Sequence, residues 1–356
     1  MESVSGRAQN ERVDATTFGR ADLMHNIRVS RRELFRALAA FVAVGLPDRI
    51  SAVGDVSAID SPTPVNFRVP PGACDCHVHV FCDPRKFPLS ADRTYTPPPA
   101  PVEALRGLLR GLGMDRVVIV SPAVYGVNND CTLDAIRQLG SQARGIALVK
   151  PQSTDSELEM LRRGGISGLR LNFETFGVTD PQIAIQQFRS ASRQAAEQGW
   201  HIQINTRLSV VEALEDQIRI GPVTVVFDHF AQARAALGVE QPGFAALVRL
   251  LRTGRVYVKI SAAYHISTQP PDYLEVAPLA RALIEANPQR ILWGSDWPHP
   301  DAAKRPGRSP TDLRPPLPVD DNRMLNLLAV WAPDPAEREA ILVENPTRLY
   351  GFESSR

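Results

Sequence analysis

The chain has 356 residues, of which 44% are hydrophobic, enough to bury one large core. Lys and Arg number 40 against 39 Asp and Glu, so the formal net charge of +1 offers no excess of positive charge to attract nucleic acid or an anionic membrane. The four cysteines (Cys74, Cys76, Cys82 and Cys131) are too few for a disulfide scaffold, and no apolar run reaches the roughly 20 residues that span a bilayer.

The N-terminal region has the layout of a twin-arginine export signal. Arg31 and Arg32 precede the apolar run 37–46, and small residues follow around Ser57. The pattern predicts that residues 1–58 are a signal region, cleaved or disordered in the mature protein. It also predicts the Tat export machinery as a partner and a periplasmic or secreted location.

Two alternatives stay open for this region. An amphipathic surface helix with a chance arginine pair would look similar. The stretch before the arginines is long, so Met24 is an alternative start to Met1. Residues 59–71 are Pro-rich and polar, and we interpret them as a linker into a domain that covers residues 72–356.

Apolar runs alternate with helical patterns through this domain. Each run is nearly all apolar, which is typical of a strand in a parallel sheet buried on both faces. The helical patterns include 101–112, 156–163, 183–198, 244–252 and 273–287. The expected strands are 73–80, 116–120, 145–149, 168–173, 201–205, 224–228, 256–261 and 291–295.

Eight such strands predict an α/β fold, a (β/α)8 TIM barrel with the site at the carboxyl ends of its strands. A doubly wound open sheet is the alternative, disfavoured because no Gly-rich phosphate loop follows the first strand.

The first strand ends in two histidines. Side chains alternate along a strand, so His77 and His79 should share one face, while Cys74, Cys76, Val78 and Val80 share the other and face the helices. Two converging imidazoles can bind a metal ion or donate hydrogen bonds to an oxyanion. Histidines that only cap a core strand are the alternative.

Polar residues also end four later strands. Asp296 is the strongest candidate for a general base, because it should face the two histidines across the barrel mouth. Arg170 and Asn172 share a face, and Arg is a natural clamp for a substrate carboxylate, with a solvated loop arginine as the alternative. The other polar residues at these ends are Asp228, His229, Lys259 and Ser261.

These residues resemble the amidohydrolase superfamily, in particular its branch of 2-pyrone-4,6-dicarboxylate lactonases and D-galactarolactone isomerases. The resemblance covers about residues 67–352 and rests on five motifs in the same order. They are CDCHVHV at 74–80, FDHFA at 227–231, YVKIS at 257–261, LWGSDWPHP at 292–300 and NPTRLY at 345–350. It implies that His77, His79 and His229 surround the substrate carbonyl and that Asp296 activates water.

The chain departs from the metal-dependent pattern of that superfamily. Relatives with metal carry a histidine at the end of strand five and, for two metals, a bridging lysine or glutamate at strand four. Here the stretches read QIN at 203–205 and RLN at 170–172. The resemblance to the lactonase branch implies no metal cofactor. A single zinc held by His77, His79, His229 and Asp296 stays open, since their donor types suit it.

We therefore expect hydrolysis of a carboxylated lactone or related cyclic ester. Arg170 should hold the substrate carboxylate; the further positioning candidates are Asn172, Tyr95, Ser121, Lys259 and Tyr264. Three alternatives stay open: lactone isomerisation on the same groups, zinc-dependent decarboxylation or hydrolysis on a similar barrel, and a barrel that binds its ligand without turnover.

Overall fold

The structure is a computed structural model that describes residues 63–303 and 307–353. The predicted signal region, residues 1–58, lies outside the described residues. Residues 63–71 of the predicted linker contain no helix or strand. None of the helices in the described ranges combines the length and apolar composition needed to cross a membrane.

Eight strands form one parallel sheet in the order β1-β2-β3-β4-β5-β6-β7-β8. The predicted TIM barrel is thus confirmed as a nearly closed barrel, and each predicted strand boundary lies within three residues of the observed one. The strands are β1 (Cys74–Val78), β2 (Arg116–Val120), β3 (Ala143–Ala147), β4 (Ile166–Asn172), β5 (His201–Asn205), β6 (Val225–Phe227), β7 (Val256–Lys259) and β8 (Ile291–Leu292).

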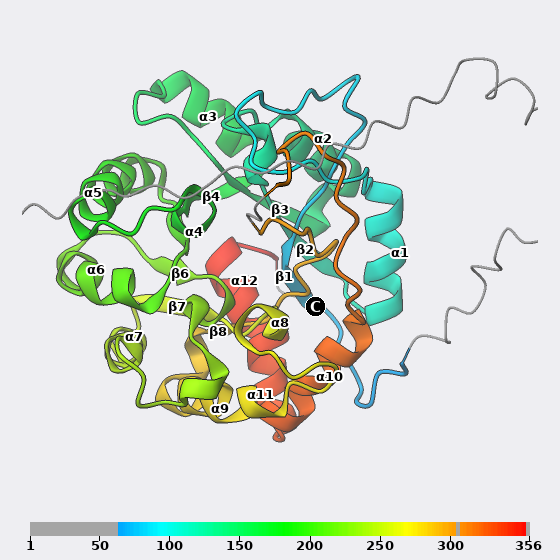
Figure 1. Ribbon diagram of the computed structural model, residues 1–356, viewed down its shortest axis with the longest axis vertical. Coiled ribbons are helices and arrows are strands. Elements are labelled where there is room, and N and C mark those ends of the chain that lie inside the picture. Colours follow the sequence, from blue (N-terminus) through cyan, green and yellow to red (C-terminus); the bar gives the residue numbers. More distant parts are fainter. Residues whose placement is uncertain (1–62, 304–306, 354–356) are drawn as a thin grey trace, which may run out of the picture. The chain divides into compact units, whose positions relative to one another are not determined.

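Helices surround the strands in Figure 1. Their apolar faces pack on the outward side chains of the sheet in one continuous core. They are α1 (Val102–Leu112), α2 (Asp130–Leu139), α3 (Asp155–Arg163), α4 (Phe173–Phe176), α5 (Pro181–Gln198), α6 (Leu208–Ile220), α7 (Phe244–Arg252), α8 (Ala263–Ile266), α9 (Ala277–Ala286), α10 (Asp321–Trp331), α11 (Pro335–Glu339) and α12 (Asn345–Tyr350).

Backbone hydrogen bonds join the two edges of the sheet. Cys76 N donates to Trp293 O at 3.0 Å, Asp296 N to His77 O at 2.8 Å, and His79 N to Trp297 O at 2.7 Å. The approach requires a glycine, because a Cβ on Gly294 would lie 2.7 Å from the backbone nitrogen of His77. The first strand and the segment after the last strand, which carry predicted site residues, are therefore held against each other.

The first strand does not alternate as predicted. Its register against β2 shifts between Asp75 and Val78, so Cys76 and His77 both lie within the irregularity. Cys74 and Cys76 are buried free thiols that pack with residues such as Tyr257, in a cluster separate from the core that contains Val78. The prediction that the cysteines share a face with Val78 was wrong, because a bulge breaks the period of two.

Cys82 and Cys131 form a disulfide across 49 residues of sequence. It connects the loop after β1 to helix α2. The sequence analysis excluded a disulfide scaffold but did not predict this single bond. Pairing two of four cysteines across a large domain adds a local restraint beside a core that is already large.

Candidate active site

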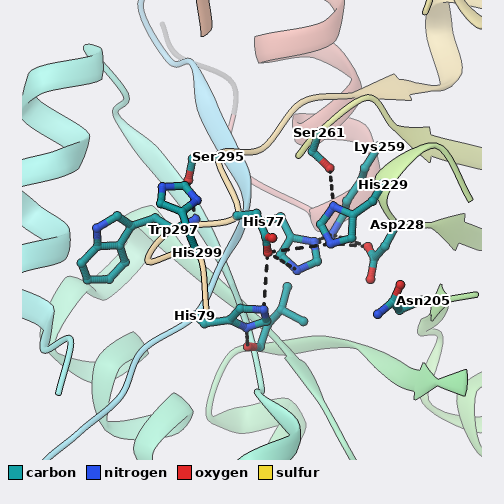
Figure 2. A network of polar contacts seen from close by, with 12 residues as sticks. His77, His79, Asn205, Asp228, His229, Lys259, Ser261, Ser295, Trp297 and His299 are labelled. Atoms are coloured by element: carbon teal, nitrogen blue, oxygen red, sulfur yellow. Dashed lines mark hydrogen bonds and ion pairs between the residues drawn. The ribbon is translucent and has the colours of Figure 1, made fainter. Parts of the chain in front are cut away.

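Three imidazoles converge on one carboxylate oxygen at the mouth of the barrel. Oδ1 of Asp296 lies 3.5 Å from His77 Nε2, 3.6 Å from His79 Nε2 and 3.8 Å from His229 Nε2. All four side chains are buried. Figure 2 shows the three imidazoles pointing toward one another. The structure thus brings together the four residues that the sequence analysis singled out as catalytic.

Strained backbone segments carry two of these residues. His229 opens a run of four residues with φ between 47° and 55° directly after β6, and Asp296 has φ of 67°. Non-glycine residues rarely adopt this left-handed region, and such conformations concentrate at functional sites. The turns aim His229 and Asp296 across the barrel at the histidines of the first strand.

The second oxygen of Asp296 has its own partners. Tyr264 OH donates to Oδ2 at 2.7 Å, and His265 Nε2 lies 3.2 Å from the same oxygen. Tyr264 was predicted to position substrate, but it contacts the carboxylate and does not line the cavity. The sequence analysis missed His265, which the short helix α8 carries next to Tyr264.

A buried ion pair lies beneath His77. Oδ1 of Asp228 is 3.3 Å from both Lys259 Nζ and His77 Nδ1, and Lys259 Nζ is also 3.3 Å from His77 Nδ1. Gln203 Nε2 donates to Oδ2 of Asp228 at 3.1 Å. Lys259 was predicted to bind substrate; it has no exposed surface and does not line the cavity. Its contacts instead support His77 from below.

Above the carboxylate lies a cavity of about 430 Å³. Arg170 lines it; its NH1 donates to the Ser121 carbonyl at 2.9 Å, and its buried Nε has no hydrogen-bond partner in residues 63–303 and 307–353. Further lining residues include His79, Tyr95, Asn172, Asn205, His229, Gln232, His265 and Asp296.

The structure places the Ser121 side chain away from this cavity. Its hydroxyl is 2.7 Å from Asn129 Oδ1 and 2.8 Å from Thr132 Oγ1. It does not line the cavity, where the sequence analysis expected it to help position substrate. Ser121 serves the site through its backbone carbonyl, which holds Arg170.

Burial keeps the three imidazoles neutral. Burial lowers the pKa of His229 to about 4. Burial and the nearby Arg170 lower the pKa of His79 to about 4. Burial and Lys259 hold the pKa of His77 well below its ordinary value. At neutral pH the histidines therefore act as uncharged groups.

Asp296 behaves differently from its neighbours. Burial raises its pKa, but His229, the hydrogen bond with His265 and His77 outweigh burial and hold the pKa well below its ordinary value. The site thus combines an ionised carboxylate, which is free to accept a proton, with neutral imidazoles.

Contacts behind the rings limit which nitrogen of each imidazole carries the proton. His79 Nδ1 lies 2.7 Å from the Val120 carbonyl, which can only accept, so the Nε2 atom of neutral His79 carries a lone pair. His77 Nδ1 lies 3.3 Å from both the Asp228 carboxylate, which can only accept, and the Lys259 ammonium, which can only donate, so these contacts do not select its tautomer. His229 Nδ1 lies 2.9 Å from the Ser261 hydroxyl, which can donate and so allows an Nε2–H on His229. Neutral His79 therefore cannot donate from Nε2 to an oxyanion, whereas neutral His229 can.

The same arrangement fits a single divalent cation. Ligand atoms of His77, His229 and Asp296 all lie within 4.8 Å of one another, and the buried His77 Nε2 has no hydrogen-bond partner among the residues described. Two imidazole nitrogens and a carboxylate are donor types that zinc prefers. A bound cation would polarise the substrate carbonyl and would be held by these residues.

A parallel eight-stranded barrel with histidines after its first and sixth strands and an aspartate after its eighth defines a class of hydrolase. The family model described as amidohydrolase matches residues 74–352, and the chain belongs to that family. A 4-sulfomuconolactone hydrolase from Rhizobium radiobacter is 37% identical to this chain. The aligned region covers 81% of this chain and 93% of that hydrolase.

Two further comparisons identify the same branch. A 2-pyrone-4,6-dicarboxylate hydrolase from Comamonas testosteroni is 33% identical to this chain. The aligned region covers 82% of this chain and 93% of that hydrolase. The solved structure of a probable 2-pyrone-4,6-dicarboxylic acid hydrolase from Acinetobacter baumannii, with citric acid bound, has a TM-score of 0.67 and 26% identity, covering 79% of this chain and 100% of that one. The chain is a lactonase-like hydrolase of the amidohydrolase family.

Proposed function

We propose that the protein hydrolyses a lactone that carries an acidic group. One observation carries the proposal: an ionised carboxylate, Asp296, is ringed by three buried imidazoles on the floor of a cavity that Arg170 lines. Relatives named as lactone hydrolases support it, and so does citric acid, a carboxylate ligand, in the Acinetobacter structure.

The chemistry follows from the proton positions. Asp296 takes a proton from water, and the water oxygen bonds to the lactone carbonyl carbon as the carbonyl electrons move to its oxygen. The Nε2–H of His229 donates to that oxyanion. When the tetrahedral intermediate collapses, the ring C–O bond breaks, and the leaving alkoxide receives the proton from Asp296. The product is the open hydroxy acid.

Arg170 supplies recognition in this proposal. Arg170 lines the cavity, and a carboxylate or sulfonate on the lactone is the natural acceptor for a guanidinium group. Tyr95 and Asn172 line the same cavity and remain candidates for positioning the ring.

Replacing Asp296 by Asn tests the proposal. We expect D296N to lose turnover by roughly a thousandfold or more, because an amide cannot accept the proton from water. Binding of the lactone, measured by calorimetry, should stay detectable because Arg170 is intact. The assay uses 2-pyrone-4,6-dicarboxylate and 4-sulfomuconolactone, with product analysis to separate hydrolysis from isomerisation. Full turnover by D296N would end the assignment.

We also propose that the protein is exported by the twin-arginine route and acts outside the cytoplasm. The Cys82–Cys131 disulfide supports this location, because such bonds persist in oxidising compartments. Replacing Arg31 and Arg32 by Lys should leave the protein in the cytoplasm of a bacterial host, as judged by cell fractionation. Unchanged export of that variant would contradict the route, and Arg36→Lys serves as the matched control.

A further inference from the structure

Three side-chain amides form a continuous line in the wall of the active-site cavity. Asn172 ends β4, Asn205 ends β5, and Gln232 closes the turn after β6. All three line the cavity together with Arg170. Gln232 Nε2 donates to Asn205 Oδ1 at 3.3 Å, and Asn205 Nδ2 donates to Asn172 Oδ1 at 3.1 Å. The hydrolytic steps above use neither Asn205 nor Gln232.

The orientation of each amide is fixed from one end of this line. The backbone N–H of Thr175 donates to Asn172 Oδ1 at 3.2 Å, and a backbone nitrogen can only donate. The oxygen of Asn172 therefore faces Thr175 and also accepts from the nitrogen of Asn205. With its nitrogen used there, Asn205 presents its oxygen to the nitrogen of Gln232. The donors and acceptors that remain for a ligand are thereby defined.

The remaining polar atoms include both donors and an acceptor. Asn172 Nδ2 and Gln232 Oε1 have no hydrogen-bond partner in residues 63–303 and 307–353. Asn172 is 5% exposed, and buried amide groups are normally hydrogen-bonded, so a ligand in the cavity is the available partner. A hydroxyl or a carboxamide can satisfy such a set because it both donates and accepts. A carboxylate has no hydrogen to donate to Gln232 Oε1.

The charges along the cavity also disfavour a second anionic group on the substrate. Among the described residues that line the cavity, Arg170 is the only lysine or arginine. Arg207 neutralises Glu174 through two hydrogen bonds. An anionic group bound away from Arg170 would therefore have no cation of the described lining as a partner, which is costly in a partly buried site. The acidic residues of the lining are Glu174, Asp296 and Asp301.

We propose that Asn172, Asn205 and Gln232 form an amide subsite for an uncharged hydrogen-bonding group of the lactone, while Arg170 holds its one acidic group. The proposal rests on the proposed lactone hydrolysis and names the substrate class: a monoacidic lactone with a neutral donor and acceptor group, in preference to a diacid. Asn205 and Gln232 determine specificity and take no part in proton transfer.

Matched ligands test this preference. 2-Pyrone-4,6-dicarboxylate carries two carboxylates, and each of its two monoamides replaces one of them by a carboxamide of the same shape. Each kcat/KM is divided by the rate constant of alkaline hydrolysis of the same lactone, which removes differences in intrinsic reactivity. We expect the better monoamide to exceed the dicarboxylate by about tenfold. A dicarboxylate turned over as well as both monoamides would overturn the proposal.

Gln232→Lys adds a cation to the amide subsite. The ratio of kcat/KM for the better monoamide to that for the dicarboxylate should fall by about tenfold or more, because the second carboxylate gains a partner. Gln232→Leu, which keeps a similar size, should remove most of the advantage of the monoamide by raising its KM. An unchanged ratio in both variants would show that Gln232 does not contact the substrate, and would overturn the proposal.

Gln194→Lys is the matched control for the added charge. Gln194 lies on α5, where its Nε2 donates to the carbonyls of Lys150 and Pro151, and it does not line the cavity. The ratio should stay at the wild-type value in this variant. A change as large as that in Gln232→Lys would assign the effect to net charge and would contradict the amide subsite.

Binding separates failure of this proposal from failure of the proposed function. If the wild-type protein hydrolyses none of the three lactones, the proposed hydrolysis fails, and their dissociation constants, measured by calorimetry, still decide the subsite. The better monoamide should then bind about tenfold more tightly than the dicarboxylate. Tighter binding of the dicarboxylate, or no binding of any of the three, would overturn the amide subsite. Turnover by D296N ends only the role of Asp296 and leaves the kcat/KM ratio as the test.

Discussion

At the scale of single residues, the Lys259 and Asp228 pair has no contact with solvent. Burial lowers the pKa of Lys259, and Asp228 opposes that shift. Burial raises the pKa of Asp228, but Lys259 and His77 outweigh it and hold the carboxyl well below its ordinary pKa. Each group therefore depends on the other, and breaking a buried pair costs more than replacing both members.

Replacing Lys259 by Met should lower the free energy of unfolding by about 3 kcal/mol, because the Asp228 charge would be left buried without its cation. Urea denaturation measures the effect. In the K259M/D228N double variant most of the loss should be regained, since the uncompensated charge is gone. A K259M variant as stable as the parent would show that Arg170, 4.0 Å from Asp228, compensates the charge alone.

The sequence could locate His77, His79, His229 and Asp296 because each lies at or shortly after the end of an apolar strand, and the carboxyl ends of parallel strands meet. It could not assign partners to Tyr264 or Ser121. Those partners depend on the path of the connecting loops, which no periodicity encodes. Tyr264 therefore appeared as a substrate contact, although its hydroxyl binds Asp296.

At the scale of elements, capping residues explain only part of what the sequence predicted. Helices α1 and α7 were expected although neither has a capping side chain, whereas α10 was not expected although Asp320 caps it. The start of α5 has Asp180 as an N-cap and Pro181 at its first position, and the sequence analysis placed this helix within two residues. Helix α6 starts after Arg207 with no capping side chain, and α2 starts after Asn129 with none in use. Neither was among the helices that the sequence analysis named.

The bulge in β1 is the element-scale feature with the largest consequence. Alternation correctly put His77 and His79 near each other, but it misplaced the cysteines. A bulge adds one residue to one strand, and the sequence pattern of alternating cysteine and histidine hides it. The register of β1 against β2 depends on how the two strands pair in the folded barrel, so the sequence of β1 alone could not predict the bulge.

At the scale of the whole molecule, the barrel holds several uncharged histidines in its interior. Besides the three at the mouth, burial and Lys259 lower the pKa of His201 to about 3. His201 lies deeper, with its ring 5.4 Å from that of Tyr350. In the unfolded chain each histidine titrates near 6.5. The unfolded state therefore binds protons at mildly acidic pH that the native state excludes.

One carboxyl group acts in the opposite direction. Burial raises the pKa of Asp75 to about 7, against hydrogen bonds from Ser295 and His77. The folded state thus binds a proton that the unfolded state has lost between about pH 4 and 7, which favours folding as the pH falls. The effect of this one carboxyl on the pH dependence of stability opposes that of four histidines, so the effect of the histidines should be the larger.

Stability should therefore fall as the pH drops from about 6.5 toward 4. A shift in pKa from 6.5 to about 4, as for His79 and His229, is worth at most about 3 kcal/mol for each histidine at 1.36 kcal/mol per unit. Urea denaturation at intervals between pH 7 and 4.5 measures the slope. His201→Gln lies outside the site, and it should reduce the slope of the free energy of unfolding against pH by the contribution of one histidine. A free energy of unfolding that is constant over this range would show that the interior admits the protons.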